Sequence, residues 1–335
     1  MKTIGPILTR QGQGDITRFI RLRFRGQTGS LIPLMSCSKI DPSLHQAKKP
    51  EWIKVRLPSN PVFFSTKALI ADLRLHTVCE SAQCPNRWEC WSQGTATFMI
   101  AGERCTRACG FCAVSTAKPF ALESDEPARV AEAVRRMKLK HVVVTAVARD
   151  DLVDGGADHF AQTILAIRAS DPDIVIEVLT PDFNGKEGSL QVIVNAQPDI
   201  FNHNLETVER LTPFVRSRAK YRLSLDVLRR VKELDPGVVT KSGIMLGLGE
   251  SESELFEAMD DLRKAHVQVL TLGQYLRPTP THLPVVQYIR PESFDMYKQI
   301  AEQKGFEFVA SGPLVRSSYH AGDYHPVRRG GAVVP

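Results

Sequence analysis

The chain of 335 residues has no long apolar run, few acidic residues at its start and almost no cysteine outside one short region. No stretch approaches the roughly 20 apolar residues that a membrane-spanning helix needs. The N-terminus also lacks the apolar core, followed by small residues, that marks a secretory signal. These absences argue against a protein that spans a membrane or is exported.

The net charge of +6 is concentrated in the first 50 residues, which hold nine basic residues against two acidic ones. The other 285 residues are therefore close to neutral, and we expect no partnership with nucleic acid. Residues 1–47 read as a basic arm that we expect to be disordered. An organelle transit peptide, and an over-long gene model whose true start is Met35, are the alternatives.

Six of the seven cysteines lie between Cys79 and Cys112, and Cys37 stands alone in the arm, where we interpret it as incidental. In a secreted chain such a group could be a disulfide framework. Nothing here indicates export, and the chain is far larger than domains that depend on disulfides. Metal binding is therefore the favoured interpretation of the six.

Apolar, β-branched runs alternate with amphipathic stretches from residue 95 onward. The predicted strands are Thr97–Ile100, Val142–Val147, Ile174–Leu179, Ile200–His203, Gly243–Leu246 and Val267–Leu272. The predicted helices are 127–138, 156–169, 187–195, 221–234, 251–265 and 292–304. Six strand–helix repeats predict an α/β fold that closes as a partial (β/α)6 TIM-like barrel over residues 95–305. Residues 48–94 and 306–335 are predicted to be N- and C-terminal extensions.

Polar clusters follow each predicted strand, at the end where barrel enzymes carry their chemistry. After the second strand come Asp150, Asp151 and Asp154, which are either paired acids or helix N-cap residues, and we favour the cap. Arg216 and Arg218 are either ligands for a carboxylate or carrier protein, or solvated arginines.

Directly after the first strand, Cys105, Cys109 and Cys112 have the spacing C-x3-C-x2-C. Three soft thiolates on a short loop suit three corners of a cubane iron–sulfur cluster, whereas structural zinc usually takes four protein ligands. With Phe111 before the last cysteine and βα units after it, the pattern resembles the radical S-adenosylmethionine (SAM) superfamily. That resemblance implies that SAM chelates the open iron and is cleaved to a radical that abstracts hydrogen from carbon.

The resemblance also implies candidate contacts to SAM. Asn204 and Glu206, at the end of the fourth strand, match residues that bind SAM in related enzymes, with buried structural hydrogen bonds as the alternative. Gly247 and Gly249 could let the backbone approach SAM closely, although glycines after strands are usually turn formers.

A second triplet, Cys79, Cys84 and Cys90, has the spacing C-x4-C-x5-C and resembles the lipoyl synthases. The resemblance covers roughly residues 50–322 and includes Trp52–Arg56, His76–Cys79, Arg149–Leu152, Leu179–Phe183, His203–Thr207, Lys241–Glu250 and Ser311–His320. It implies that Ser318 is the fourth ligand of an auxiliary cluster, where spacing alone favours a polar turn. Ala148 departs from the pattern, since many lipoyl synthases have aspartate there.

What the resemblance implies is an enzyme with two 4Fe-4S clusters and SAM that inserts sulfur at C6 and C8 of a protein-bound octanoyl-lysine. Its implied partners are octanoylated lipoyl domains of 2-oxoacid dehydrogenases, the glycine cleavage H protein, ferredoxin or flavodoxin as electron donor, and an iron–sulfur carrier protein. The alternatives are another sulfur-inserting enzyme, such as a biotin synthase, and a non-enzymatic iron–sulfur or zinc module. We expect a cytoplasmic location, because Cys90–Thr95 runs straight into the first strand as in bacterial lipoyl synthases, or the mitochondrial matrix if the arm is a transit peptide.

Overall fold

The computed structural model describes residues 48–54, 60–216, 218–319, 321–324 and 326. The predictions for the arm at 1–47 and for Cys37 lie outside these residues. The described residues belong to one compact unit, 46–335. Within the described chain, no helix has both the length and the apolar character needed to cross a membrane.

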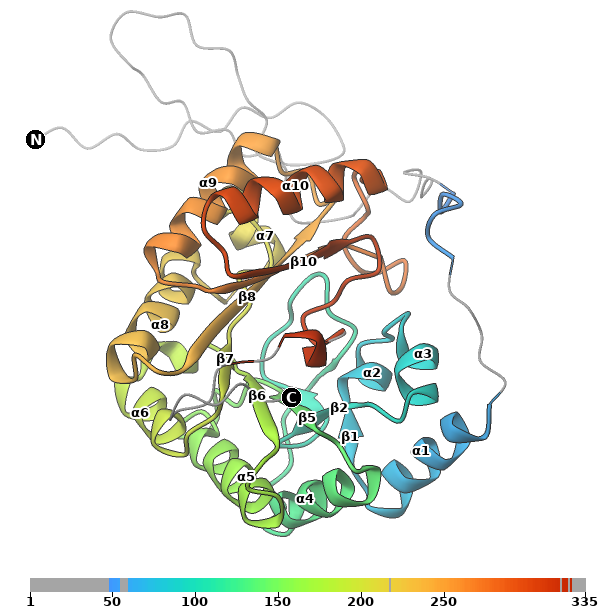
Figure 1. The fold of residues 1–335 in the computed structure, drawn as a ribbon, viewed down its shortest axis with the longest axis vertical. Coiled ribbons are helices and arrows are strands. Elements are labelled where there is room, and N and C mark those ends of the chain that lie inside the picture. The colour runs from blue at the N-terminus through green and yellow to red at the C-terminus, as the bar shows by residue number, and fades with distance from the viewer. Residues whose placement is uncertain (1–47, 55–59, 217, 320, 325, 327–335) are drawn as a thin grey trace, which may run out of the picture. The chain divides into compact units, whose positions relative to one another are not determined.

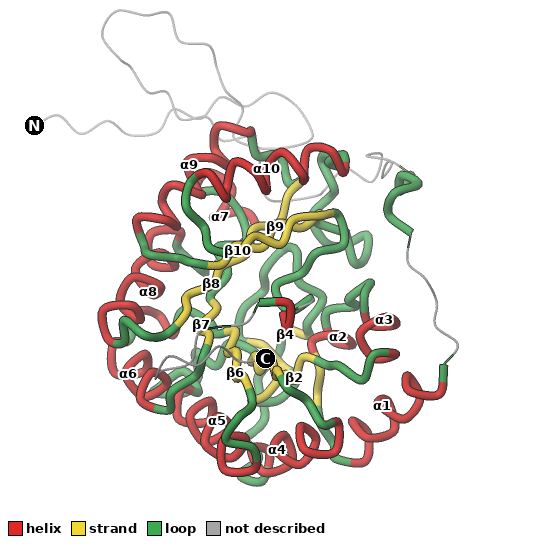
Figure 2. Tube along the Cα trace, in the orientation of Figure 1, coloured by secondary structure: helices red, strands yellow, loops and turns green. Residues whose placement is uncertain are grey.

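Helices surround the strands of this unit, as Figures 1 and 2 show. The α-helices are α1 Pro61–Asp72, α2 Val78–Ser81, α3 Arg87–Ser92, α4 Glu126–Met137, α5 Ala157–Ser170, α6 Glu187–Asn195, α7 Thr212–Val215, α8 Tyr221–Leu234, α9 Glu252–Lys264 and α10 Pro291–Gln303. The strands are β1 His76–Thr77, β2 Thr97–Ile100, β3 Arg104–Cys105, β4 Ser115–Thr116, β5 His141–Ala146, β6 Val175–Leu179, β7 Ile200–Asn202, β8 Val239–Leu246, β9 Val269–Gln274 and β10 Phe308–Gly312. Each helix predicted in the barrel is present within two residues of its predicted ends.

The main sheet has the order β1-β2-β5-β6-β7-β8-β9-β10. All neighbours pair in parallel except β1 and β2, which are antiparallel. The two edge strands, β1 and β10, do not pair with each other, so the barrel is partial, as the sequence predicts. The six predicted strands are all present. The structure has an additional parallel strand, β10, beyond the predicted barrel boundary at residue 305. The sequence did not predict this strand, because its short run Phe308–Gly312 has little apolar signal of its own.

Local sequence explains where the helices begin. Ser251 and Glu254 form a reciprocal capping box at the start of α9, in which each side chain accepts from the other's backbone N–H. Proline lies in the first turn of α4 and of α10, where its missing N–H has no helical partner to lose. These residues therefore fix where α4, α9 and α10 begin.

The barrel interior is filled in layers. At the N-terminal ends of the strands, Val175, Ile200, Val239 and Val269 form an apolar plug, against which Phe308 and Tyr324 pack. One layer up, Lys241 Nζ lies 2.9 Å from Glu177 Oε1. These two layers fill the barrel at the N-terminal ends of β6 to β9, while the cavity wall extends from residues 138–141, at the start of β5, to the loops at the C-terminal ends of the strands.

Residues 313–319, which we call the C-terminal strap, leave β10 and cross the barrel interior to reach β2 (Figure 1). Two glycines on the inner face of the sheet make room for it. A Cβ on Gly273 would lie 2.1 Å from Val315 O, and one on Gly243 would lie 3.2 Å from Ser317 Oγ. The strap therefore depends on the absence of a side chain at Gly273, whereas a Cβ on Gly243 would meet Thr271 Oγ1 at 2.6 Å and Asn204 Oδ1 at 2.9 Å before the strap.

Candidate functional site

One cavity of about 1160 Å³ inside the barrel contains both groups of predicted ligands. The residues on its wall include Cys79, Cys84, Cys90, Cys105, Cys109, Cys112 and Ser318. Asn204 and Glu206 also line it, whereas Gly247 and Gly249 do not. The structure thus brings together residues that are separated by more than 200 positions in the sequence.

The loop that carries the Cys105 triplet is held on several sides. Thr106 N–H donates to Ala148 O at 3.1 Å, and Gly110 N–H donates to Val215 O at 3.0 Å. From the segment after β9, Leu283 N–H donates to Gly110 O at 3.0 Å. These bonds satisfy backbone groups of a loop that has no long regular structure of its own.

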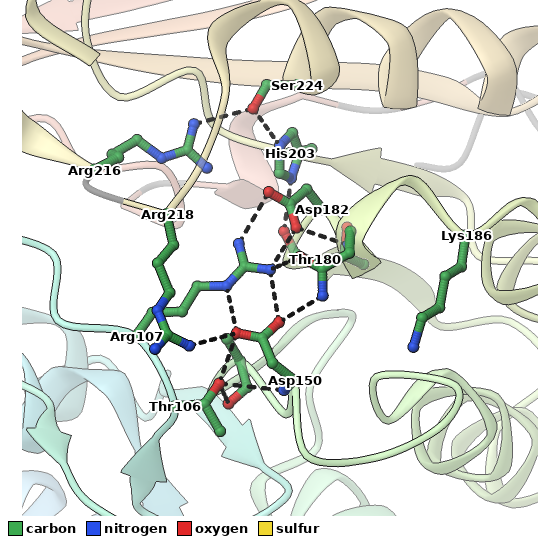
Figure 3. Close-up of polar contacts among 12 residues, drawn as sticks. Thr106, Arg107, Asp150, Thr180, Asp182, Lys186, His203, Arg216, Arg218 and Ser224 are labelled. Carbon is green, nitrogen blue, oxygen red and sulfur yellow. Dashed lines mark hydrogen bonds and ion pairs between the residues drawn. The ribbon is translucent and has the colours of Figure 1, made fainter. Parts of the chain in front are cut away.

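Arg107, inside this loop, binds two aspartates of neighbouring loops (Figure 3). Its Nη2 lies 2.7 Å from Asp150 Oδ1 and 2.7 Å from Asp182 Oδ1. Hydrogen bonds from Arg107 hold the pKa of Asp150 at about 2. Burial raises the pKa of Asp182, but the Arg107 guanidinium outweighs it and leaves that pKa below its ordinary value. Both carboxyl groups are therefore ionised at neutral pH.

The Cys79 triplet is carried by two short helices and the turn between them. Cys79 lies in α2, which Thr77 caps by accepting the N–H of Glu80 at 3.3 Å, and Cys90 lies in α3. The ring of Trp88 stacks on Phe63 at a centroid distance of 4.9 Å, which packs α3 against α1. Packing of helices, rather than a network of charges, positions these thiols.

The C-terminal strap completes the wall beside the Cys79 triplet. Thr97 Oγ1 donates to Ser318 Oγ at 2.8 Å, and Asn86 Nδ2 donates to Leu314 O at 2.6 Å. Tyr319 Oη donates to Glu89 at 3.1 Å. Ser318 is therefore fixed next to the start of β2, on the same cavity wall as the three upstream thiols.

The described cysteines are free thiols, of which Cys79 is buried and the others are partly buried. Burial, and then the neighbouring thiols, raise the pKa of Cys79 to about 11 and that of Cys90 to about 12. Burial likewise raises the pKa of Cys109 to about 11 and that of Cys112 to about 12. In the metal-free protein these thiols are protonated at neutral pH, and iron binding would remove their protons.

The donor sets fit two iron–sulfur clusters. Cys79 and Cys84 lie close enough to Cys90 to raise its pKa, after burial, and Cys109 and Cys105 do the same to Cys112. Among the described residues, no three cysteine, histidine, aspartate or glutamate side chains converge on a single ion. In a four-iron cluster each thiolate binds a different iron, so the ligands lie further apart than those of one ion. Each set of three thiols, one of them beside the Ser318 hydroxyl, has the donor chemistry that such a cluster takes.

Polar groups face the cavity between the two triplets. Asn204 Nδ2 donates to Ser317 Oγ at 2.6 Å and to Glu206 Oε1 at 3.1 Å. Asn204 Oδ1 is buried and has no hydrogen-bond partner among the described residues, so it is open to a ligand's donor. Burial raises the pKa of Glu206 and lowers that of Arg316, two groups that attract each other across the cavity.

The two predicted glycine contacts lie elsewhere. A Cβ on Gly247 would lie 2.2 Å from Gln287 O and 2.3 Å from Gln274 Nε2, so protein atoms already approach it closely. Gly249 lies near the side chain of Val286. Direct contact of Gly247 or Gly249 with SAM remains a prediction without support from the cavity wall.

The other predicted polar residues divide between roles. Asp154 accepts the N–H groups of Gly156 and Asp158 and so satisfies donors at the start of α5, although the N-cap residue itself is Gly156. The cap interpretation is wrong for Asp150, which binds Arg107, and for Asp151, which binds Arg149 at 2.9 Å. Spacing cannot distinguish a carboxylate that caps a helix from one that pairs with a distant arginine.

Arg216 is buried rather than solvated. Its Nη1 donates to Ser224 Oγ at 3.1 Å, and Ser224 Oγ lies 3.0 Å from His203 Nε2 (Figure 3). Arg218 is exposed and lies 3.9 Å from Asp150. Burial, and then the charge of Arg216, lower the pKa of His203 to about 4, so this imidazole is neutral at physiological pH.

Sequence reasoning missed Arg107, Asp182 and the glycines under the strap. Arg107 is a spacer in the cysteine pattern, and Asp182 was noted only as part of a motif. Gly243 and Gly273 lie in or beside predicted strands. A glycine on the inner face of a barrel strand is a usable signal, because it indicates close approach of another backbone.

Known proteins resemble this chain in sequence and in fold. A model of the radical SAM superfamily matches residues 99–262. The chain is 58% identical over 275 residues to a lipoyl synthase of Geobacillus kaustophilus, which covers 82% of this chain and 92% of that protein. It is 55% identical over 285 residues to a lipoyl synthase of Rubrobacter xylanophilus, with coverage of 85% and 89%.

Among solved structures, Streptococcus suis SuiB bound to its precursor peptide SuiA has a TM-score of 0.52 at 12% identity. The match covers 64% of this chain and about half, 48%, of that chain, and it shows a shared fold alone. Identity above half of the aligned positions, over most of the chain, is decisive for the family. The chain belongs to the lipoyl synthase family of radical SAM proteins.

Proposed function

We propose that this chain is a lipoyl synthase, which replaces one C–H bond at C6 and one at C8 of a protein-bound octanoyl chain with C–S bonds. The observation that carries the proposal is the single cavity lined by both cysteine triplets and Ser318. A reaction that removes hydrogen and adds sulfur at two carbons of one substrate chain needs both reagents close to that chain.

In this proposal, Cys105, Cys109 and Cys112 hold one 4Fe-4S cluster with an open iron for SAM. Cys79, Cys84, Cys90 and Ser318 hold the auxiliary cluster. When bound, these groups would supply the electron, the hydrogen-abstracting radical and the sulfur. A hydroxyl is a poorer match for iron than a thiolate, which suits a cluster that gives up its sulfur.

The chain's own residues bind, orient and exclude water. The unpaired Asn204 Oδ1 accepts from the amino or hydroxyl groups of SAM, and Arg316 faces a carboxylate or the cluster's negative charge. The apolar wall formed by Met99, Val143 and Leu179 suits an alkyl chain and keeps water away from reactive carbon. The plug fills the barrel interior at the N-terminal ends of β6, β7, β8 and β9.

The proposed substrates are octanoylated lysines on lipoyl domains of 2-oxoacid dehydrogenases and on the glycine cleavage H protein. Ferredoxin or flavodoxin as electron donor, an iron–sulfur carrier protein and a cytoplasmic location belong to the same proposal. The location is supported by the direct run from Cys90 into β2, without an inserted segment.

The test is an iron count combined with single-turnover products from an octanoyl-lysyl peptide, SAM and dithionite. We expect about eight irons per chain, in two four-iron clusters, and a lipoyl product. Cys84→Ala should retain about four irons and SAM cleavage, but insert no sulfur. Cys109→Ala should also retain about four irons, while SAM cleavage falls by at least about 1000-fold. Four irons in the unmodified protein, or sulfur insertion by Cys84→Ala, would contradict the proposal.

A further inference from the structure

Arg107 uses almost all of its hydrogen-bonding capacity on two neighbouring loops (Figure 3). Its Nε and Nη2 donate to the two oxygens of Asp150 at 2.9 and 2.7 Å. Its Nη1 and Nη2 donate to the two oxygens of Asp182 at 2.9 and 2.7 Å. One planar guanidinium therefore makes a two-pronged contact with each of two carboxylates, which a lysine ammonium cannot reproduce.

Further contacts close the network into a ring. Asn184 Nδ2 donates to Asp150 Oδ1 at 2.9 Å, and Asn184 Oδ1 accepts from Arg107 Nη2 at 3.0 Å. Thr106, next to Arg107, donates to Asp150 Oδ2 at 2.9 Å. The side chains of Arg107 and Asp182 are 7% and 1% exposed, so water screens this pair weakly.

The position of this ring relates it to the cysteines. Arg107 lies two residues after Cys105 and two before Cys109, and its N–H donates to Cys105 Sγ at 3.4 Å. Asp150 follows β5 and Asp182 follows β6, the next strand in the sheet. The ring therefore ties the cysteine loop to the ends of two adjacent strands that form the cavity wall.

Contacts from the segment after β9 hold the opposite side of the loop. His282 Nε2 lies 3.0 Å from Cys112 O, and the Leu283 side chain packs where a Cβ on Gly110 would lie. These contacts restrain the second half of the loop, whereas Arg107 makes the ionic contacts of its first half, beside the bond from Thr106 N–H to Ala148 O. An uncompensated pair of carboxylates would remain if the guanidinium were removed, and their repulsion would push the loops after β5 and β6 apart.

We propose that Arg107 is a positioning residue that fixes the Cys105–Cys112 loop against the loops after β5 and β6 before any cluster binds. Arg107 acts through the loop and through Asp150 and Asp182, not on the substrate. Preordering the loop lowers the entropy that cluster assembly must overcome and sets where the open iron faces the cavity. The part that concerns the cluster rests on the proposed function, and the part that concerns the metal-free loop does not.

The first experiment measures hydrogen–deuterium exchange of the metal-free protein. In Arg107→Ala, the protected amides of Thr106 and Gly110 should exchange at least about tenfold faster than in the unmodified chain. Arg107→Lys keeps the positive charge but not the two-pronged contacts, so its exchange rates should lie between those of the unmodified chain and those of Arg107→Ala. Asp182→Asn, which keeps an oxygen acceptor and the side-chain shape, should loosen the same amides.

Arg168→Ala is the matched control. Arg168 Nη2 pairs with Asp199 Oδ2 at 2.7 Å, and its Nη1 binds Ile174 O near the N-terminal end of β6, away from the cysteine loop. This variant should lower global stability while leaving exchange at Thr106 and Gly110 unchanged. Equal loosening by Arg168→Ala, or unchanged exchange in both Arg107→Lys and Asp182→Asn, would overturn the proposal.

The second experiment uses reconstituted protein in which Cys79, Cys84 and Cys90 are alanine, so that iron can bind only at the Cys105 triplet. With Arg107→Lys, a chelator should remove iron several-fold faster, and the electron paramagnetic resonance spectrum of the reduced cluster should broaden. Slower iron release in Arg107→Lys than in Arg107→Ala would distinguish a loss of positioning from a loss of the fold. Unchanged release and spectra in Arg107→Lys would refute the cluster part, whereas failure of the parent protein to bind iron would refute the proposed function and leave the exchange result standing.

Discussion

The two cysteine triplets face one cavity but are built in different ways. The Cys105 triplet lies on one loop, which charged and backbone hydrogen bonds tie to adjacent strand ends. The Cys79 triplet lies on two short helices, and the Ser318 hydroxyl comes from the C-terminal strap. One site is thus fixed by its own loop, and the other is assembled from separate parts of the chain.

Because of this difference, the two sites should be sensitive to different substitutions. The loop site depends on the ionic ring and on neighbours that are close to it along the β5 and β6 loops. The assembled site depends on whether the strap lies correctly across the barrel interior. Changes under the strap should therefore damage the auxiliary site alone, and changes behind the loop should affect the other region.

Gly273→Ala should break the comparison most strongly. The new Cβ would lie 2.1 Å from Val315 O, and neither atom belongs to a flexible side chain end. We expect a loss of up to roughly 3 kcal/mol in unfolding free energy and loss of iron at the Cys79 triplet, with iron retained at the Cys105 triplet. Urea unfolding and iron counts check this.

Gly312→Ala is the control for that change, because its Cβ would make an ordinary contact of 3.5 Å with the Val315 side chain. It should keep both clusters. Equal loss of iron from both triplets in Gly273→Ala would show that the strap does not distinguish the two sites.

His203→Gln should sharpen the comparison through pH. The pKa of His203 lies at about 4 in the folded state, below its ordinary value of 6.5, because of burial and then Arg216. As the pH falls, His203 therefore takes up a proton in the unfolded state before it does so in the folded state. Its contribution to the unfolding free energy is fully present above pH 6.5 and is lost as the pH falls towards 4. Between pH 6.5 and pH 5 the unfolding free energy should fall by about 1.5 kcal/mol, and His203→Gln should remove that slope.

The exposed His266 provides the control, since His266→Gln should leave the slope between pH 6.5 and pH 5 intact. Denaturant unfolding at a series of pH values gives both curves. A slope that survives in His203→Gln would place its origin in another group.

Thr97→Val should produce the smallest effect. It removes the hydroxyl that donates to Ser318 Oγ at 2.8 Å and costs about 1 kcal/mol. Thr145→Val removes a comparable bond to Leu179 O, also of 2.8 Å, and should cost about the same. Only Thr97→Val should speed iron loss from the Cys79 triplet, measured with a chelator; the same rate in both variants would mean that Thr97 does not steady Ser318.

The parts of this molecule that could be predicted from sequence are those governed by short-range patterns. Alternating apolar runs predicted the strands from Thr97 to Leu272, because burial on both faces of a parallel sheet needs them. Cysteine spacing indicated which thiols the fold would bring to one loop, and their role as cluster ligands stays a prediction. Strand β10 and the first half of β8 were not predicted. Lys241 and Ser311 interrupt the apolar character of these strands, and their side chains bind long-range partners.

Contacts between distant loops left no pattern to read. Arg107 is one arginine among many, and only the fold shows that Asp150 and Asp182 meet it. The local sequences around Asp150 and Asp154 are alike, so the sequence predicted the same capping role for both. In the structure Asp154 accepts N–H groups at the start of a helix, whereas Asp150 binds Arg107. Ser318 was reached through family resemblance, since no local feature separates it from a residue in a polar turn.

The C-terminal strap has a consequence for the order in which the protein is made. Thr97 and Ser318 are 221 positions apart, so a ribosome that adds 5–20 residues per second needs roughly 10–45 s to travel between them. The residues of the loop site, up to Asp182, are all synthesised well before that interval ends. During translation the upstream cysteines must therefore wait as free thiols, and a chain that stops before the strap has a barrel but no complete second site.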